Sequence, residues 1–248
     1  MRRAALVAAT ILLTACGQTT ADHRAASSDE PEAAPVTVFA AASLHKAFPE
    51  VSVGMRVDYS FDGSSGLVDQ LRGGAPADVF ASADSTTMDR AMEEGLIDGE
   101  PVMFATNRLV LVTPQGNPAG VTGFDSSLAG TRLVVCAPEV PCGAATLGAA
   151  ERSGLGLAPV SEESSVTDVL GKVTSGEADA GVVYATDAAQ AGDRVETFDV
   201  PGADEEPNTY WIAVLADAPN PEGAEAFVEL VLGPGQAALS ANGFGGPT

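Results

Sequence analysis

Short apolar runs that alternate with longer helical patterns constrain the fold of this chain more than any other feature. The runs are rich in aliphatic and aromatic residues and have the length of buried strands. They occupy residues 36–39, 56–59, 78–81, 109–113, 133–136, 180–184 and 211–215. Between them, the spacing of apolar residues indicates helices over residues 66–72, 86–94, 143–152, 166–175 and 222–232. This alternation predicts an α/β fold with mainly parallel sheets and flanking helices.

Two breaks divide the folded region. The strand over residues 109–113 is followed by Pro-Gln-Gly-Asn-Pro, and a second break, Val-Pro-Gly-Ala-Asp, begins at residue 200. Clusters of Pro and Gly end regular structure and mark boundaries. We therefore expect two lobes joined by two crossings. Residues 36–112 and 202–248 would form the first lobe, and residues 113–201 the second.

The start of the chain has the features of an export signal. Arg2 and Arg3 precede an apolar run over residues 4–13 that is too short to span a bilayer. The sequence Leu-Thr-Ala-Cys ending at Cys16 resembles the lipobox of bacterial lipoproteins, in which the Cys is lipidated and becomes the new N-terminus. We expect residues 1–15 to be the signal peptide and residues 16–35 a flexible, lipid-anchored linker on the outer face of the cytoplasmic membrane. An ordinary cleaved signal peptide is the alternative.

The balance of charge limits the partners of this protein. Its 12 basic and 34 acidic residues give a formal net charge of −22. Such a surface repels nucleic acids and anionic lipid headgroups, so neither is expected as a partner. Internal helix ends and hydroxyl groups can still bind an anion, because surface charge is screened within about 8 Å at physiological salt.

Two of the three cysteines lie in the folded region. Cys136 and Cys142 are six residues apart, and an exported domain favours a disulfide between them. A metal-binding pair and a thiol nucleophile are the alternatives. Only His45 remains in the folded region as an imidazole partner, and two cysteines without further histidines do not complete a zinc site.

Two serines follow predicted strands in a way that suggests an anion site. Ser43 comes after Val-Thr-Val-Phe-Ala-Ala-Ala and before a predicted helix over residues 45–51. Ser64 follows Tyr-Ser-Phe-Asp-Gly and precedes the helix over residues 66–72. A helix N-terminus presents unpaired N–H groups with partial positive charge, and a Ser hydroxyl can add another donor. Taken alone, each serine is equally explained as a helix cap or a turn residue.

Several segments together resemble the molybdate-binding receptors of bacterial ABC importers. They are Phe-Ala-Ala-Ala-Ser-Leu from residue 39, Ser-Phe-Asp-Gly-Ser-Ser from residue 60, Gly-Ala-Pro-Ala-Asp-Val-Phe-Ala-Ser-Ala-Asp from residue 74, Pro-Glu-Val-Pro-Cys-Gly from residue 138 and Gly-Val-Val-Tyr-Ala-Thr-Asp from residue 181. The resemblance covers residues 36–244. It implies a two-lobed type II periplasmic-binding-protein fold that closes around one tetrahedral oxyanion and delivers it to an ABC permease. The protein would act as a monomer and need no cofactor.

The resemblance also implies five ligand contacts. Ser43 and Ser64 would supply hydroxyl and backbone N–H donors from the first lobe. Cys142 and Val166 would supply backbone N–H groups, and Tyr184 its phenolic O–H. Cys142 departs from the Ala that the family usually has at its position, which puts the geometry of that loop in question.

These donors suit a fully deprotonated dianion. A protonated oxyanion such as hydrogen phosphate would require an acceptor, and none of the five positions supplies one. This chemistry favours molybdate, tungstate or sulfate over phosphate, and the resemblance implies molybdate or tungstate. A receptor of the same fold for sulfate or another oxyanion is the first alternative. A Cys-based redox enzyme is the second, but the chain has no Gly-x-Ser-x-Gly motif and too few histidines for a Ser/His/Asp triad.

Overall fold

A computed structural model describes residues 34–247 of the chain. The predicted signal peptide, the lipidation of Cys16 and nearly all of the predicted linker lie outside the described residues. Within the described range, strands and helices form two lobes, each built on a five-stranded sheet. None of the described helices combines the length and the apolar character that a membrane span requires.

The first sheet has the strand order β2–β1–β3–β10–β4. Its strands are β1 (Val36–Ala41), β2 (Val57–Asp62), β3 (Val79–Ser82), β4 (Ile97–Asn107) and β10 (Asn208–Leu215). The first three are parallel to one another, whereas β10 runs antiparallel to both β3 and β4.

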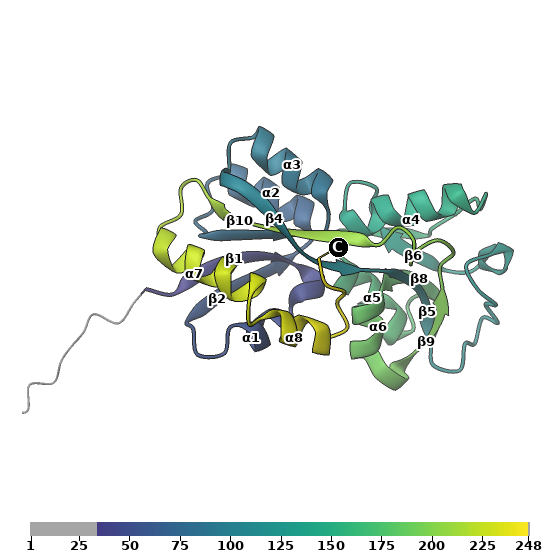
Figure 1. Ribbon diagram of the computed structural model, residues 1–248. Coiled ribbons are helices and arrows are strands. Elements are labelled where there is room, and N and C mark those ends of the chain that lie inside the picture. The colour runs from purple at the N-terminus through teal and green to yellow at the C-terminus, as the bar shows by residue number, and fades with distance from the viewer. Residues whose placement is uncertain (1–33, 248) are drawn as a thin grey trace, which may run out of the picture. The chain divides into compact units, whose positions relative to one another are not determined.

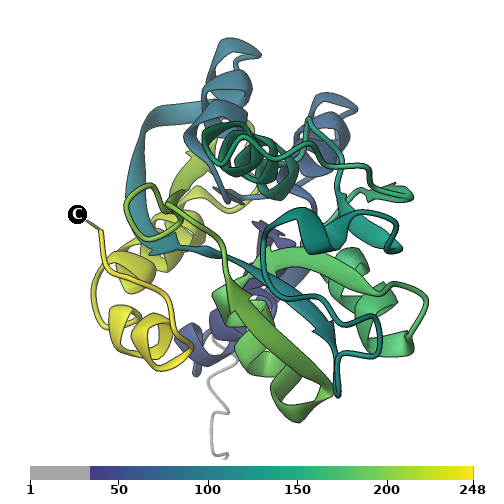
Figure 2. The ribbon, with the colours of Figure 1, turned by 90° about the vertical axis from the view of Figure 1, so that its right-hand side faces the viewer.

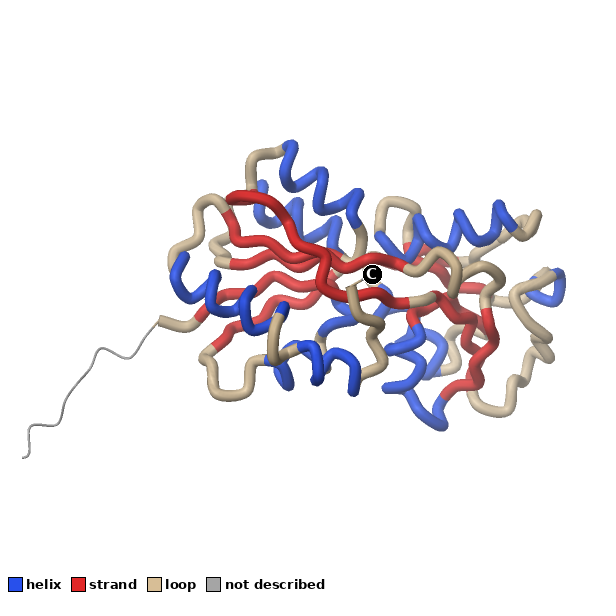
Figure 3. Tube along the Cα trace, in the orientation of Figure 1, coloured by secondary structure: helices blue, strands red, loops and turns tan. Residues whose placement is uncertain are grey.

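Helices cover both faces of the first sheet (Figures 1 and 3). They are α1 (Ala47–Val51), α2 (Ser64–Arg72), α3 (Ser85–Glu93), α7 (Pro221–Leu232) and α8 (Gln236–Ala241). Alternation along β1 explains the two cores: Val38 packs with α1, α7 and α8, whereas Phe39 packs with α2 and α3 on the opposite face. The C-terminal helix α8 lies beside α1 (Figures 1 and 2).

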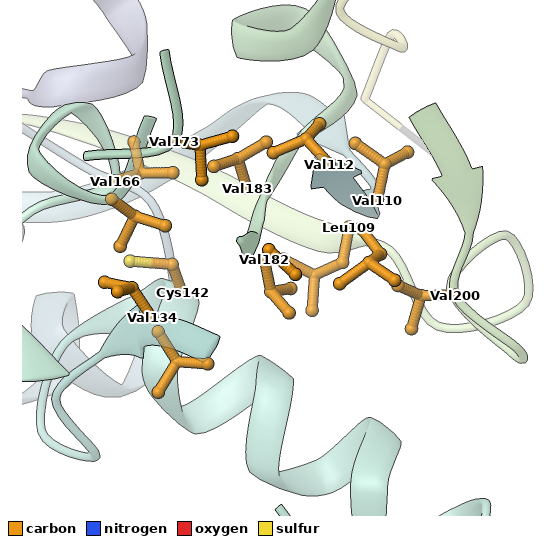
Figure 4. Close-up of a cluster of buried hydrophobic side chains, with 14 of the residues drawn as sticks. Leu109, Val110, Val112, Val134, Cys142, Val166, Val173, Val182, Val183 and Val200 are labelled. Atoms are coloured by element: carbon orange, nitrogen blue, oxygen red, sulfur yellow. The ribbon is translucent and has the colours of Figure 1, made fainter. Parts of the chain in front are cut away.

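The second sheet has the order β7–β6–β8–β5–β9. Its strands are β5 (Leu109–Pro114), β6 (Leu133–Cys136), β7 (Ser161–Glu163), β8 (Ala180–Tyr184) and β9 (Val195–Asp199), and its helices are α4 (Pro141–Arg152), α5 (Val166–Ser175) and α6 (Ala185–Ala191). Short 3-10 turns span Ser126–Leu128 and Gly192–Arg194. Valines of β5 and β8 form the centre of a single buried cluster that also contains Cys142 and Val166 (Figure 4).

The two-lobed α/β fold is as predicted, but each sheet is mixed. In the second sheet β6 is parallel to β7 and β8, while β5 is antiparallel to β8 and β9. The antiparallel pairs involve β4, β5, β9 and β10, the strands next to the two crossings between lobes. Because β5 belongs to the second sheet, the first crossing falls at Arg108, before the expected boundary after residue 112. The chain passes there directly from strand to strand, without the Pro or Gly that a sequence-based boundary requires.

Candidate functional site

The five residues predicted to contact a ligand all line one small cavity between the lobes. Ser43, Ser64, Cys142, Val166 and Tyr184 are joined there by Ala41, Ala42, Asp62, Gly63, Ala83, Val140 and Pro141. The cavity volume is about 10 Å³, on the scale of one water molecule. None of these lining residues is Lys, Arg or His.

Ser43 lies in a 3-10 turn over Ala42–Leu44 that directly follows β1. Its side chain caps no helix. α1 covers Ala47–Val51 of the helix predicted over residues 45–51, but it begins after Lys46, so the prediction that Ser43 is its N-cap was wrong. The Ser43 hydroxyl instead forms a 2.8 Å hydrogen bond with the hydroxyl of Tyr210 in β10. Both side chains are buried, with 1% and 0% of their surface exposed. A tertiary contact therefore holds Ser43, not a local cap.

Ser64 is the first residue of α2, where Gly63 occupies the N-cap position. The backbone N–H of Ala83, just after β3, donates to Ser64 Oγ over 3.1 Å. The N–H groups of the first turn of a helix have no acceptor within the helix. Ser64 therefore brings both a backbone and a hydroxyl donor to the cavity wall.

Tyr184 ends β8 and is 1% exposed. Asn208 Nδ2, at the start of β10, donates to Tyr184 Oη over 3.0 Å. Burial raises the pKa of Tyr184 well above its ordinary value, and nearby Tyr210, Asp84 and Asp187 add to the rise. The residue is therefore a neutral phenol with a proton to donate.

Cys142 and Val166 contribute the starts of two helices from the second lobe. Pro141 opens α4, which suits its fixed φ and missing N–H, and Cys142 follows it. Ser165 caps α5 by accepting from the backbone N–H of Asp168, and Val166 is the first helical residue. Both helix starts direct partial positive charge at the cavity.

The predicted disulfide between Cys136 and Cys142 is confirmed, with a Cα–Cα distance of 5.7 Å. It joins the end of β6 to the first turn of α4. The loop that it closes is tight: a Cβ added at Gly143 would lie 1.9 Å from the carbonyl oxygen of Ala137. The Cys142 thiol is thus committed to the bridge.

The carboxylates near the cavity are occupied or buried. Asp62 Oδ1 accepts from the Gly63 N–H over 2.7 Å, and its Oδ2 accepts from Gln70 over 3.3 Å. Asp187, in α6, is fully buried, and neither carboxyl oxygen reaches a partner with hydrogen-bonding geometry. Burial raises the pKa of Asp187 to about 7, although the nearby backbone N–H groups of Tyr184 and Asp187 oppose part of the shift.

The two lobes touch each other around the cavity. Ser65 Oγ, in the first lobe, donates to the carbonyl oxygen of Glu139 in the second. Ala42 packs into the hydrophobic cluster of the second lobe. At Gly63 an added Cβ would lie only 2.0 Å from the carbonyl oxygen of Ser164. Contacts between the two lobes therefore flank the cavity.

Sequence reasoning missed the residues behind the cavity wall. Asn107, Asn208 and Tyr210 lie at the ends of the two strands next to the crossings, β4 and β10. No motif in their own segments marks them, because their partners Ser43 and Tyr184 are distant in sequence. Among the described residues, no cluster of His, Cys, Asp and Glu suits a metal ion.

A small cavity between two α/β lobes, lined by serines, a tyrosine and the starts of helices, is typical of a binding protein for a small solute. Residues 33–245 match the family described as bacterial extracellular solute-binding protein, and the chain belongs to that family.

The chain is similar in sequence or in fold to several proteins named as molybdate-binding proteins. The chain is 45% identical over 221 residues to the molybdate-binding protein ModA of Mycobacterium tuberculosis (strain H37Rv), covering 86% of this chain and 85% of that protein. It is 35% identical to ModA of Escherichia coli K12, covering 80% and 84% of the two chains. The fold matches that of the Azotobacter vinelandii periplasmic molybdate-binding protein, with a TM-score of 0.75, 24% identity and coverage of 86% and 100%.

Proposed function

We propose that this chain captures molybdate, or tungstate, between its two lobes and delivers the anion to an ABC permease. Relatives at 45% and 35% identity are named molybdate-binding proteins, and they match this chain over most of its length. The proposal makes Ser43, Ser64, Cys142, Val166 and Tyr184 the ligand contacts. The protein would bind and release its ligand without catalysis and without a resident cofactor.

One observation supports the proposal: residues that carry hydroxyl groups or stand at helix starts come from both lobes to line one cavity, and the lining includes no cationic side chain. Donors of this kind stabilise negative charge through fixed dipoles. A fully deprotonated oxyanion offers acceptors on all sides and satisfies every donor. Hydrogen phosphate carries a proton that would require an acceptor, and none of the five proposed contacts supplies a carboxylate.

Titration calorimetry of the soluble domain tests this function directly. Molybdate and tungstate should bind tightly with one site per chain, sulfate weakly and phosphate least. Binding of sulfate in preference to molybdate would replace the proposed ligand with another oxyanion of the same charge. An absence of binding to all four anions would refute the proposal.

We further propose that the protein is exported and held at the outer face of the cytoplasmic membrane by lipid on Cys16, and that it acts as a monomer. The family is described as extracellular, and the sequence Leu-Thr-Ala-Cys follows an apolar run. In a host that processes lipoproteins, Cys16→Ser should block processing or release the protein from membranes. Normal cleavage with unchanged membrane retention would exclude the lipid anchor.

A further inference from the structure

A set of hydrogen bonds behind the cavity wall directs the protons of the cavity hydroxyls toward the cavity. Each hydroxyl can donate one proton and accept at its oxygen. If the oxygen already accepts from a group that can only donate, the hydroxyl keeps its own proton for another partner. Ser64 shows the principle, because its Oγ accepts from the backbone N–H of Ala83.

Tyr184 is held in the same way by Asn208. The Asn208 amide nitrogen donates to the carbonyl oxygen of Ala83 over 3.3 Å and to Tyr184 Oη over 3.0 Å. Since a carbonyl oxygen only accepts, the contact with Ala83 fixes which end of the amide is the nitrogen. Tyr184 Oη therefore accepts from Asn208, and its O–H proton remains to be donated.

Ser43 is held by a longer chain that begins at Asn107. The backbone N–H of Arg108 donates to Asn107 Oδ1 over 3.0 Å, which fixes the orientation of this amide. Asn107 Nδ2 then donates to Thr186 Oγ1 over 2.8 Å and to Tyr210 Oη over 3.4 Å.

Tyr210 cannot donate to an amide nitrogen, so its proton goes either to Ser43 Oγ, 2.8 Å away, or to the neighbouring hydroxyl of Tyr184. Burial raises the pKa of Tyr210, so this proton is present at physiological pH. When Tyr210 donates to Ser43, the proton of Ser43 is free for the cavity. A bound anion that accepts from both Ser43 and Tyr184 selects this arrangement.

We infer that Tyr210 and Asn208 are positioning residues, which direct the hydroxyl protons of Ser43 and Tyr184 at the bound oxyanion. The inference rests on the proposed function, because Ser43 and Tyr184 are ligand contacts only if the anion occupies this cavity. It explains how three hydroxyls, each able to donate or accept, come to present their protons to the cavity. Selectivity for a deprotonated anion then depends on residues that do not touch it.

A double-mutant cycle on molybdate affinity tests this inference. Tyr210→Phe keeps the ring and removes the donor to Ser43, and Asn208→Ala removes the donor to Tyr184. Each should weaken molybdate binding roughly tenfold in the parent. In a Ser43→Ala background, however, Tyr210→Phe should change affinity by less than about twofold, and the same holds for Asn208→Ala in a Tyr184→Phe background.

Matched controls separate positioning from general damage. Tyr59→Phe deletes a half-buried hydroxyl of the first lobe, one bonded to Phe48 O and Ser52 Oγ outside the cavity. Asn242→Ala deletes an amide that donates to Glu50 and to the carbonyl of Ala238. Both controls should bind molybdate like the parent. Thermal unfolding of every variant shows which ones remain folded at the temperature of the titration.

Competition by sulfate and phosphate tests positioning separately from stability, because a residue that only stabilises the fold should not change which of the two anions displaces molybdate better. The two anions are similar in size, but at mildly alkaline pH phosphate retains a proton and sulfate has none. Sulfate should displace molybdate from the parent better than phosphate does. We call the ratio of sulfate affinity to phosphate affinity the gap. Tyr210→Phe and Asn208→Ala should each narrow this gap several-fold, because Ser43 Oγ or Tyr184 Oη loses its donor and can accept the phosphate proton.

The outcomes distinguish the inference from the proposed function. Molybdate binding by the parent, non-additive cycles and a narrowed gap support the inference. Molybdate binding by the parent with additive cycles, or with an unchanged gap in the folded variants, overturns the inference alone. A parent that binds no molybdate overturns the proposed function, and the inference falls with it.

Discussion

Replacing Gly63 with Ala should separate ligand capture from folding. Gly63 has φ −59° and ψ 134°, a conformation open to Ala, so the substitution imposes no backbone strain. The new Cβ would nevertheless lie 2.0 Å from the carbonyl oxygen of Ser164 in the opposite lobe, against 3.4 Å for an ordinary contact. The two lobes would therefore stay roughly 1.4 Å farther apart at this contact, or the start of α5 would move by that amount.

Either adjustment moves donors away from the anion. A hydrogen bond of about 2.9 Å lengthened by 1.4 Å no longer meets the distance limit. The backbone N–H of Val166, two residues after Ser164, is the most exposed to this change. Loss of one bond to a charged acceptor costs about 1.5–3 kcal/mol, which predicts molybdate binding weaker by roughly ten- to a hundredfold. Unfolding stability should fall by no more than about 1 kcal/mol, the cost of a poorer N-cap residue.

Titration calorimetry of Gly63→Ala alongside Gly66→Ala measures the effect. Gly66 lies on the same helix, and its added Cβ would meet nothing closer than Asp62 Oδ2 at 3.7 Å, an ordinary contact. Gly66→Ala should therefore bind molybdate like the parent, and its free energy of unfolding should be higher by about 0.5–1 kcal/mol. Parental affinity in Gly63→Ala would show that contact between the lobes at Ser164 is not needed for binding, and the reasoning about closure would be wrong.

Three further perturbations test other parts of the site. Ser43→Ala, Ser64→Ala and Tyr184→Phe should each weaken molybdate binding by roughly ten- to a hundredfold in calorimetry, while the folds remain intact; parental affinity in all three would place the ligand elsewhere. Reduction of the disulfide should lower the free energy of unfolding by about 2–2.5 kcal/mol in urea titrations, as expected for its short loop, and an unchanged midpoint would contradict the estimate. The parent should lose stability as pH rises from about 4 to 7, because in this range Asp187 is protonated in the folded state, where its pKa is raised, and ionised in the unfolded state. Asp187→Asn, which cannot ionise, should not show this loss. Above pH of about 7, this loss should reach at most about 4 kcal/mol of the parent's free energy of unfolding. Parallel curves of unfolding free energy against pH for the two proteins would refute the prediction.

The sequence predicted the strands with continuous apolar runs and missed the ones without them. Residues 133–136 and 180–184 form strands with the predicted bounds, because buried valines leave little alternative. The long strand β4 escaped prediction because its first half contains Gly99 and Pro101, which normally interrupt strands. With β4 and the first part of β10 unrecognised, neither the mixed sheets nor the first crossing at Arg108 could be placed.

The candidate site could be predicted where a local motif marks it. Serines after strands and residues at helix starts are visible in the chain, and the structure brings all five predicted positions to one cavity. The role of Ser43 was partly misread, because its fixed partner, Tyr210, is 167 residues away. The positioning residues Tyr210 and Asn208 lie 167 and 24 residues from their partners, outside any local motif. Hydrogen bonds between lobes depend on the closed arrangement of the whole fold, which no local pattern encodes.

A crystal structure of the soluble domain grown with molybdate tests the central claim most directly. Anomalous scattering from molybdenum locates the anion without reference to the protein. The account predicts one strong peak in the cavity between the lobes, with anion oxygens within hydrogen-bond distance of the hydroxyls of Ser43, Ser64 and Tyr184 and of the backbone N–H groups of Cys142 and Val166. A molybdenum peak at another place on the protein, with this cavity empty, would contradict it.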